Sequence, residues 1–577
     1  MNTEMSTAKY SRKITADVIV VGGGLAGLCA AISSARNGAE TILIQDRPMP
    51  GGNASSEIRM WICGSHVAEY REGGLVEMLK LANHHYNPSL KYTIWDHVMR
   101  DALENEPKLQ CFFNTSVRDV KCEDDTITSV LAWGLTDYTE YEFCGKIFAD
   151  CSGDSILALS GADYVTGRED KNEYNEPWGM DEADKKTMGN SVLMQLRKCG
   201  VDTPYRAPKW AYHYTEETVP REPLAYPGDN FWWLEFGGIK DTIGDAAEIN
   251  RELIRIALGY WEYIKNHPDG RAKGWTMDWV GSLPGKRENR RYVGDYVLTQ
   301  NDAESTASFD DAVAYGCWST DDHAPEAIYH TGGPNRNGLL DPGYHVPYRC
   351  LYSRNIKNLM FAGRNISASH LALSAVRVMA TCGMFGQAAG TAAALACKHG
   401  CTPRELGANH LDELQQTLML QDQFLPRMKR RPGAAAAAGI PSDPRICDGV
   451  ERDSSDPVEE HSITLAAGAS CSFTFEKPVV IGGFRAIWDS DFSDPKRMLC
   501  NENDLPIASV PATIAEEFVV EVRRGNTWSE VAKCTENYQR LNLVTFSPCE
   551  ADEIRLTVTV LRNADTPARL FAFEPLD

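Results

Sequence analysis

The pattern of apolar and polar positions near the N-terminus predicts a β-α-β unit. The segment 17–21 is apolar after its first residue, as expected for a buried strand. Residues 25–37 are rich in alanine and place apolar side chains at helical spacing, and Gly38 marks the end of this helix. Residues 41–46 return to a short apolar run and predict the next strand.

Two later regions continue the alternation of strands and helices. Segments 116–122, 127–133 and 141–149 alternate in polarity and carry β-branched or aromatic residues, which predicts a β-meander followed by a return strand. Residues 358–362 predict a further strand, and residues 371–398, packed with alanine and glycine, predict one long helix. Between these regions the chain is rich in Trp, Tyr, Pro and charge, so we interpret it as an inserted substrate-side domain.

The C-terminal part of the chain changes class. Residues 426–441 contain an alanine run and predict a linker with a short helical piece. Beyond it, no amphipathic helix separates the predicted strands, which indicates a small all-β sandwich or jelly roll. These strands are 462–465, 470–475, 479–487, 518–522, 541–546 and 554–560.

The charge and cysteine content narrow the function classes. A formal net charge of −22 repels phosphate backbones and anionic lipid, so we expect no nucleic acid and no membrane as partner. The polar segment 1–16 lacks the apolar core of a signal peptide. The 17 cysteines form no CxxC pair, and the spacing of Cys397 and Cys401 has no second ligand pair, so we expect no metal site and a cytoplasmic, reducing location.

The strongest chemical motif is a GxGxxG sequence at residues 22–27, between the first strand and the helix. Gly22 permits the tight turn, Gly24 lets the backbone approach a pyrophosphate, and Gly27 lets helix and strand pack closely. The phosphates then lie at the positive end of the helix. With a strand, a helix and a second strand at the right spacing, the motif predicts a bound dinucleotide.

The ribose contact departs from the usual pattern. An acidic residue normally ends the second strand and binds the ribose hydroxyls. Gln45 occupies this place and Asp46 follows it. Either side chain can hydrogen-bond a diol, so both are candidates.

Several further segments resemble the fumarate reductase and succinate dehydrogenase type of flavoprotein. They are the glycine turn at 51–56, the strand and turn at 148–154, and the strand at 358–364 followed by the helix with Gly383 to Gly390. With Asp46-Arg47-Pro48, residues 51–59, 287–291 and 367–377, they resemble the FAD-dependent oxidoreductase family over about residues 16 to 400. Many relatives carry Gly-Asp where this chain has Gly363-Arg364.

The resemblance implies FAD as the cofactor, with the N-terminus of the last helix aimed at the pyrimidine end of the flavin. It also implies a set of cofactor-binding residues along the motifs. They are Gly22, Gly24, Leu25, Ala26, Gly27, Gln45, Asp46, Arg47, Gly51, Gly52, Asn53, Ala54, Ser55, Arg59, Val117, Cys151, Ser152, Gly153, Gly363, Arg364, Gly383, Gly386, Gln387 and Ala388.

The predicted fold class is α/β. A Rossmann-like FAD-binding domain receives an inserted α+β substrate domain, and an all-β sandwich follows. The predicted boundaries are 16–164 and 341–425 for the FAD-binding domain, 165–340 for the insertion, 426–441 for the linker and 442–577 for the sandwich. The sandwich resembles a discoidin-like jelly roll, a kind of domain that binds carbohydrate or serves in structure and oligomerisation.

His370 and a group of arginines are the first catalytic candidates. His370 precedes the flavin-facing helix, where it can accept a proton from a hydroxyl or simply cap the helix. Arg287, Arg290 and Arg291 can bind a carboxylate, polarise a carbonyl, or form a salt-bridged surface segment. Arg377 supports substrate or flavin in one reading and a core ion pair in the other.

The segment after the second glycine turn offers further candidates. His66 is a candidate general base, or a site of covalent flavin attachment together with Cys63. Glu57 and Arg59 lie in the same stretch. Asp322, His323 and His330 lie in the inserted region, and for each we expect a structural role more than a catalytic one.

We therefore expect an oxidoreductase that transfers hydride between a small polar substrate and N5 of the flavin. A sugar or sugar-like alcohol is preferred because of the appended sandwich alone. The alternatives are reduction of an activated C=C bond of the enoate type, and a carbohydrate-binding protein with a vestigial flavin site. No second GxGxxG is found, so oxygen or an unidentified electron acceptor or donor must complete the cycle. A homo-oligomer is compatible with the sequence.

Overall fold

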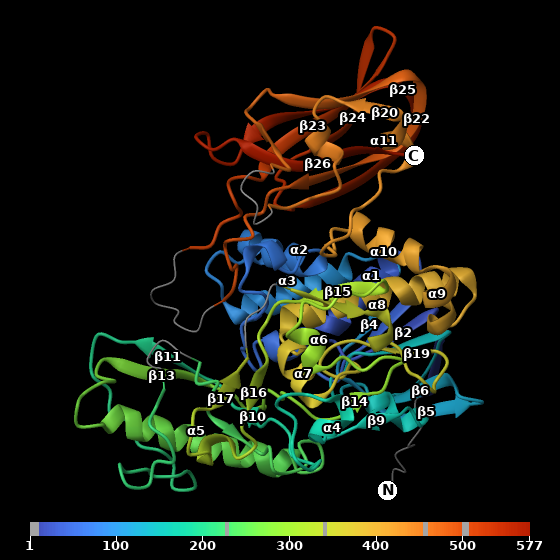
Figure 1. The fold of residues 1–577 in the computed structure, drawn as a ribbon. Coiled ribbons are helices and arrows are strands. Elements are labelled where there is room, and N and C mark those ends of the chain that lie inside the picture. The colour runs from blue at the N-terminus through green and yellow to red at the C-terminus, as the bar shows by residue number, and fades with distance from the viewer. Residues whose placement is uncertain (1–10, 225–229, 339–342, 454–459, 499–506) are drawn as a thin grey trace, which may run out of the picture. The chain divides into compact units, whose positions relative to one another are not determined.

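The computed structural model describes residues 11–224, 230–338, 343–453, 460–498 and 507–577 (Figure 1). The chain divides into two compact units. The first unit comprises Met1–Gly64, Lys91–Leu414 and Arg497–Pro506, and the second comprises Ser65–Leu90, Gln415–Lys496 and Ile507–Asp577. The polar N-terminal segment 1–16 is not expected to be a signal peptide. Residues 1–10 of it lie outside the described residues.

A parallel five-stranded sheet forms the centre of the first unit. Its strands are short, apolar and mostly buried, because helices cover such sheets on both faces. The order is β19-β8-β2-β3-β4, which confirms the predicted β-α-β unit. The strands are β2 (Val18–Val21), β3 (Thr41–Ile44), β4 (Leu109–Phe112), β8 (Ile147–Asp150) and β19 (Leu359–Phe361).

Two buried helices pack closely beside this sheet. They are α1 (Leu25–Arg36) and α8 (Met379–His399). A Cβ atom at Gly386 would lie 2.0 Å from the carbonyl oxygen of Ala26, and one at Gly390 would lie 2.1 Å from that of Ala30. The two glycines therefore allow the helix backbones to touch, and a side chain at either position would force α1 and α8 apart.

The single helix predicted over residues 371–398 is two helices. The first is α7 (His370–Val376), and α8 follows after a bend of 95°. The bend arises because Val378 has extended backbone angles, φ −64° and ψ 141°, which interrupt the helical hydrogen-bond ladder. Among the described residues no single helix has the length and apolar composition to span a membrane, and α7 and α8 meet that test only when counted together.

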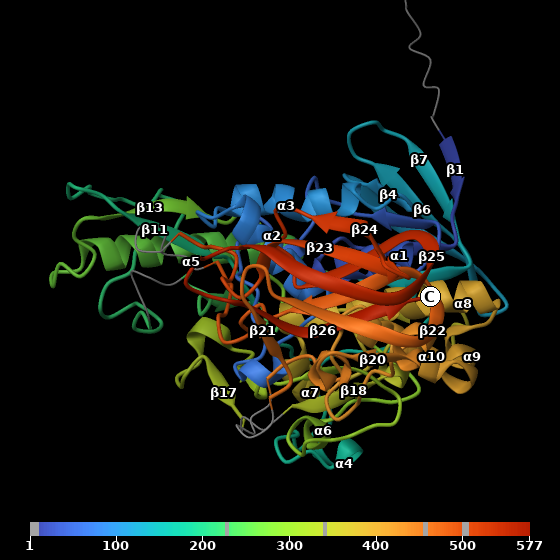
Figure 2. The ribbon, with the colours of Figure 1, turned by 90° about the horizontal axis from the view of Figure 1, so that it is seen from above.

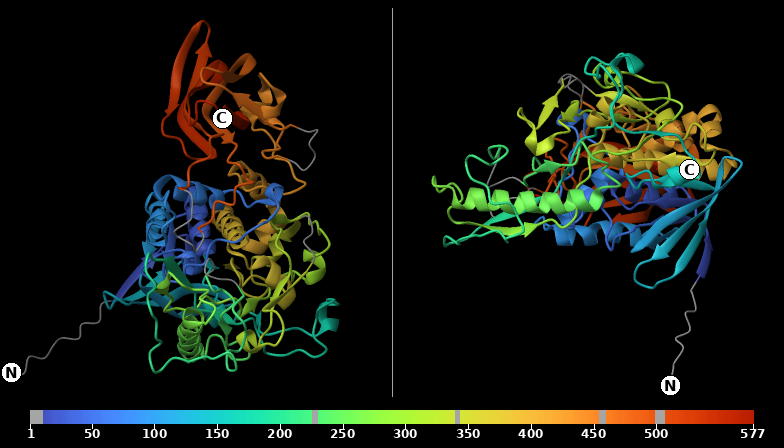
Figure 3. Two further views of the ribbon diagram at one scale, coloured as in Figure 1. Left: turned by 90° about the vertical axis from the view of Figure 1, so that its left-hand side faces the viewer. Right: turned by 90° about the horizontal axis from the view of Figure 1, so that it is seen from below.

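The predicted β-meander is present as a separate sheet, visible in light blue in Figure 3. The run 141–149 is divided between this sheet and the central one, because the chain leaves the ladder at Gly145. An N-terminal strand that the sequence pattern did not predict joins the edge in parallel. The strands are β1 (Ser11–Thr15), β5 (Thr115–Glu123), β6 (Thr126–Gly134) and β7 (Glu140–Cys144).

The inserted region is built from a long helix and short hairpins. Helix α5 (Ala246–Asn266) buries Ile256, Tyr260 and Trp261 in an aromatic core shared with the β11–β13 hairpin (Figure 1). The strands here are β9 (Tyr164–Val165), β10 (Asn190–Ser191), β11 (Met194–Lys198), β12 (Glu235–Phe236), β13 (Trp275–Val280), β14 (Arg291–Tyr292), β15 (Ala312–Gly316), β16 (Asp321–His323), β17 (Asn335–Asn337) and β18 (Tyr344–Pro347). The remaining helices of this unit and its C-terminal end are α3 (Tyr92–Glu104), α4 (Lys171–Tyr174), α6 (Gln300–Ala303), α9 (Pro403–Asn409) and α10 (Leu411–Leu420).

The second unit is an antiparallel β-structure, seen with its strands side by side in Figure 2. Two pairs of predicted strands are each one long strand, because register shifts let β22 and β25 bend without ending. Leu81 of α2 (Leu75–Tyr86) belongs to the same apolar core as Phe484 and Phe573. The other elements are α11 (Ala434–Ala438), β20 (Gly439–Pro441), β21 (Ile463–Leu465), β22 (Ser470–Trp488), β23 (Ala515–Arg524), β24 (Thr527–Cys534), β25 (Leu541–Leu561) and β26 (Ala568–Leu576).

Buried ion pairs hold the segment before the sandwich to its strands. The Arg485 guanidinium of β22 donates to both carboxylate oxygens of Glu451, at 2.5 and 2.6 Å. Arg540 donates to Asp422 at 2.9 Å. Because all four groups are largely withdrawn from solvent, each charge depends on its partner.

Candidate functional site

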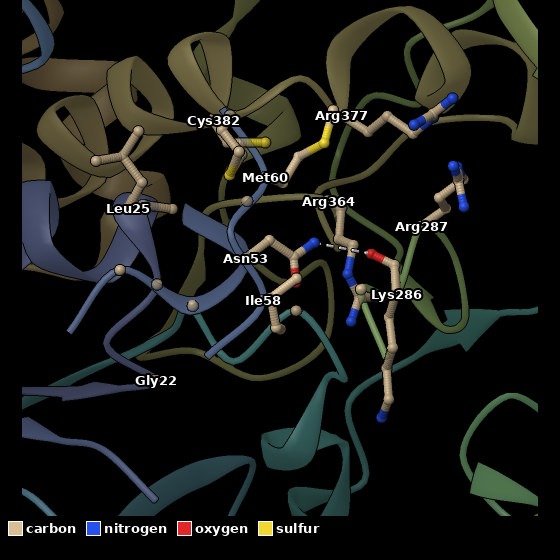
Figure 4. A pocket seen from close by; sticks show the side chains of 18 of the residues that line it. Gly22, Leu25, Asn53, Ile58, Met60, Lys286, Arg287, Arg364, Arg377 and Cys382 are labelled. Carbon is tan, nitrogen blue, oxygen red and sulfur yellow. Dashed lines mark hydrogen bonds between the residues drawn. The ribbon is translucent and has the colours of Figure 1, made fainter. Parts of the chain in front are cut away.

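A cavity of about 660 Å³ lies within the first unit. This volume falls in the range of small-molecule and cofactor sites. One end is formed by the turn before α1, the end of β3 and the Gly51-Gly52 turn. Figure 4 shows Gly22 and Leu25 at one end of the view and Arg287 and Arg377 at the other.

The glycine motif is shaped for a ligand that passes close to the backbone. Gly22 has φ +98°, and a Cβ there would lie 2.5 Å from Ser152 Cα. A Cβ at Gly27 would lie 1.8 Å from the carbonyl oxygen of Gly22. At Gly24 no protein atom lies within 4 Å of a Cβ position, and the residue lines the cavity. Gly22 and Gly27 thus build the turn, whereas Gly24 leaves space for a ligand at the N-terminus of α1.

Gln45 and Asp46 have different roles at the end of β3. The Gln45 side-chain oxygen accepts a hydrogen bond from the Gly23 N–H at 2.8 Å, and its amide donates to Met49 O at 3.3 Å. The buried Gln45 side chain therefore braces the glycine turn. Asp46 also lines the cavity, and its carboxylate is 59% exposed. Of the two candidates, Asp46 has the carboxylate available for a ribose diol.

A charged cluster lines the middle of the cavity. Asp154 accepts hydrogen bonds from Lys286, from Arg364 at 2.5 Å and from Asn289 at 2.5 Å. Burial alone would raise the pKa of Asp154, but the charges of Arg364 and Lys286 lower it to about 2. Arg364 Nη1 is buried without a hydrogen-bond partner among the described residues. The arginine found in place of the usual aspartate is therefore matched by Asp154 and keeps one donor for an anionic ligand.

The far end of the cavity contains a histidine between two carboxylates. His323 Nδ1 lies 2.6 Å from Glu235, and Nε2 lies 3.3 Å from Asp321. Glu235 also pairs with Arg287 at 2.9 Å. Trp232 packs its ring edge-on to the His323 ring, with centroids 5.8 Å apart. The sequence made His323 a candidate for the pocket lining, with a structural role preferred, and His323 does line the cavity.

Arg377 lies at the break between α7 and α8. It donates to the Asp321 carbonyl at 3.0 Å and to the carboxylate at 3.1 Å. Burial would raise the pKa of Asp321, but His323 and Arg377 hold it well below its usual range. Val378, Met379 and Cys382 line the cavity beside Arg377, so the N-terminus of α8 faces this space.

His370 does not line the cavity and cannot serve as the predicted base. Its Nδ1 lies 2.9 Å from both oxygens of Glu288, and its Nε2 lies 3.0 Å from Asp322. Burial would lower the pKa of His370, but these carboxylates raise it to about 10. The ring is therefore an imidazolium at neutral pH, with both N–H groups already donated.

The predicted arginine group is also divided. Arg287 lines the cavity. Arg291 is completely buried and pairs with Glu169 and Glu288, so it is a core residue. Arg290 stacks on Tyr164 with 5.1 Å from the guanidinium carbon to the ring centroid and does not line the cavity.

Other predicted residues lie elsewhere. His66 belongs to the second unit and is exposed, whereas Cys63 lines the cavity. Arg59 donates to Gln195 at 2.5 Å, outside the cavity lining. The predicted cofactor residues that do not line the cavity are Gly27, Ala54, Ser55, Arg59, Gly383, Gly386, Gln387 and Ala388. Among the α8 residues, Gly386 packs against the Ala26 backbone of α1.

The remaining predicted cofactor residues do meet in one cavity. They are Gly22, Gly24, Leu25, Ala26, Gln45, Asp46, Arg47, Gly51, Gly52, Asn53, Val117, Cys151, Ser152, Gly153, Gly363 and Arg364. Asn53 donates to the Lys286 carbonyl at 3.2 Å and ties the glycine turn to the opposite wall (Figure 4). The fold and this cavity define a Rossmann-like dinucleotide-binding protein.

The chain belongs to a family of oxidoreductases: the family model described as FAD dependent oxidoreductase matches residues 17–418. This confirms the predicted family, the enzyme class and FAD as cofactor. The open position at Gly24 and the unpartnered donor of Arg364 fit a dinucleotide with an anionic pyrophosphate.

Three solved structures that resemble this chain share less than a fifth of their residues with it. A quinol fumarate reductase variant of Escherichia coli has 13% identity and a TM-score of 0.27, covering 73% of this chain and 76% of that one. A geranylgeranyl bacteriochlorophyll reductase-like protein of Thermoplasma acidophilum has 12% identity and a TM-score of 0.30, covering 71% and 85%. A chitosan-binding module of a Paenibacillus chitosanase/glucanase has 18% identity and a TM-score of 0.17, covering 25% and 88%.

Proposed function

We propose that this FAD-dependent oxidoreductase oxidises a small polyhydroxylated substrate, a sugar or sugar-like alcohol, with His323 as the proton acceptor. The observation that carries the proposal is the Glu235–His323 pair in the cavity wall. Three tryptophans and two of the three asparagines that line the same cavity suit the apolar faces and hydroxyl groups of a sugar. They are Trp61, Trp232, Trp318, Asn335 and Asn337.

The hydrogen bonds around His323 suit a base. Glu235 is buried and lies 2.6 Å from Nδ1, so it orients the ring and favours a proton on that nitrogen. Nε2 makes a 3.3 Å contact to Asp321, longer than the 3.0 Å contact of His370 to Asp322. His323 acts as a base in the form that carries its proton on Nδ1 alone, once a substrate hydroxyl has replaced Asp321 at Nε2. Bound FAD supplies the two-electron acceptor for such an oxidation. His323 takes the hydroxyl proton at Nε2, and Glu235 stabilises the resulting imidazolium.

The test is anaerobic reduction of the protein-bound flavin by neutral sugars and polyols, followed as loss of its visible absorbance. We expect His323→Gln to slow reduction by roughly 10²- to 10⁴-fold, the usual contribution of a positioned base. His330→Gln is the matched control, because His330 lies outside the cavity lining. A His323→Gln enzyme that reduces its flavin at the wild-type rate would overturn this assignment.

A second candidate is reduction of a C=C bond conjugated to a carboxylate. The observation in its favour is the pair of largely buried guanidinium groups, Arg287 and Arg377, in the cavity wall. Guanidinium forks bind carboxylates through two parallel hydrogen bonds. Under this alternative, fumarate or crotonate reoxidises the chemically reduced enzyme under anaerobic conditions, and no polyol reduces the oxidised enzyme.

A further inference from the structure

Arg497 supplies a third guanidinium to the far end of the cavity. It lies outside the residues matched by the family model, in the sequence between strands β22 and β23 of the second unit. Arg497 nevertheless belongs to the first unit and lines its cavity. A residue from the C-terminal part of the chain therefore helps to form the cavity of the oxidoreductase unit.

The three arginines differ in how their charges are balanced. Arg287 pairs with Glu235 at 2.9 Å, and Arg377 pairs with Asp321 at 3.1 Å. Arg497 forms no ion pair with any residue that the structure describes, and its buried Nε has no hydrogen-bond partner there. Among the described residues, the far end of the cavity thus has three guanidinium groups and the two carboxylates of Glu235 and Asp321, in a chain whose formal net charge is −22.

Arg497, Arg377 and Cys63 all line the cavity, and both guanidinium groups act electrostatically on the Cys63 thiol. Burial raises the pKa of the Cys63 thiol to about 11, while the positive charges of Arg497 and Arg377 act in the opposite direction. Both guanidinium groups therefore act on the same side chain of the cavity wall. A partly buried cation without a counter-ion is costly, and binding an anion removes that cost.

We propose that Arg497 binds a carboxylate group of the substrate, so that the substrate is a polyhydroxylated acid of the uronate or aldonate type. This inference rests on the proposed oxidation of a sugar-like alcohol and narrows its substrate class. The guanidinium fork accepts a carboxylate in two parallel hydrogen bonds. His323 and Asp321 remain available to the hydroxyl groups. The family-matched residues then provide the chemistry, while Arg497 selects the acid.

The experiment uses the full-length holoenzyme and two pairs of probes. D-Glucuronate is compared with D-glucose, and D-gluconate with D-glucitol, by titrating each into the enzyme and recording the change in the flavin absorbance spectrum. We expect both acids to bind and their neutral partners to bind at least tenfold more weakly. A charged hydrogen bond contributes about 1.5–3 kcal/mol, so Arg497→Gln should weaken acid binding roughly 10- to 150-fold.

Two further variants keep the test decisive. Arg497→Lys keeps the charge but loses the planar fork, so we expect an intermediate affinity for the acids. Arg354→Gln is the control, because Arg354 pairs with Asp163 away from the cavity lining. Flavin content and thermal midpoint are compared first. If Arg497→Gln loses its flavin, the ratio of acid to neutral affinity in Arg497→Lys decides the question.

Three results would overturn the inference. They are equal binding of acid and neutral probes, wild-type acid binding by Arg497→Gln, and no spectral change with any acid. Failure of the proposed oxidation has a different signature. In that case the acids bind through Arg497, but neither acid nor neutral probe reduces the flavin.

Discussion

Replacing Gly24 with alanine tests whether the cofactor passes over the glycine turn. The backbone of Gly24 has φ −63° and ψ 177°, which alanine adopts without strain, and no protein atom lies within 4 Å of the added Cβ. The apoprotein should therefore fold. Because alanine is a poor residue at a helix N-cap, we expect a free energy of unfolding lower by about 1 kcal/mol and, for a unit of this length, a thermal midpoint lower by about 1 °C.

The same methyl group enters the space that the pyrophosphate must use. Overpacking by one methyl costs about 1–3 kcal/mol, and each 1.4 kcal/mol is a tenfold change in affinity. We therefore expect Gly24→Ala to bind FAD roughly 5- to 150-fold more weakly than the wild type. The assay is titration of FAD into apoprotein, followed by quenching of flavin fluorescence.

Gly27→Ala provides the contrast. Its Cβ would lie 1.8 Å from the carbonyl oxygen of Gly22, so this variant should lower the stability of the apoprotein as well as FAD binding. If Gly24→Ala binds FAD within twofold of the wild type, the cofactor does not approach the backbone at this turn, and the assignment of the cavity is refuted.

Two buried ion networks predict pH-dependent stability. His370→Gln should lower the free energy of unfolding by about 3–5 kcal/mol near neutral pH. The pKa of His370 in the folded protein, about 10, lies above the ordinary value of 6.5. The stabilisation by the charged ring is therefore complete below pH 6.5 and is lost as pH rises through 10. The gap in thermal midpoint between wild type and variant should shrink between pH 6.5 and 9.5, and a constant gap contradicts the reasoning. Glu451→Gln should lower the free energy of unfolding by a similar amount. Burial would raise the pKa of Glu451, but the charge and hydrogen bonds of Arg485 outweigh burial and lower this pKa to about 2. The wild-type advantage is then complete above pH 4.5 and is lost as pH falls towards 2, so a gap in midpoint that grows on acidification speaks against it.

The cofactor end was predictable because its signals are local in sequence. Gly22, Gly24 and Gly27 are each required by a contact or an opening within one turn, and their spacing carries that information. The apolar runs of β2 and β3 likewise predict buried parallel strands. Such features depend on neighbours a few residues away, so a single sequence is enough to find them.

The substrate end was not predictable in the same way. His370 and His323 both contact carboxylates in the folded chain. His370 is enclosed by Glu288 and Asp322, whereas His323 lines the cavity. Their carboxylate partners are as far as 88 residues away in the chain, as for Glu235 and His323. A sequence pattern cannot assign such partners.

The fold class, the flavin family and the glycine turn at the cavity follow from residue patterns along the chain. Which histidine and which arginines reach the cavity depends on how distant segments pack. The bend at Val378 is an example, since it turns Gly386 towards α1 and brings Arg377 to the site. Arg497 is another, because it joins the cavity from a segment remote from the family-matched residues. Side chains from distant segments can form one site only when packing brings them together, and that packing depends on the whole chain.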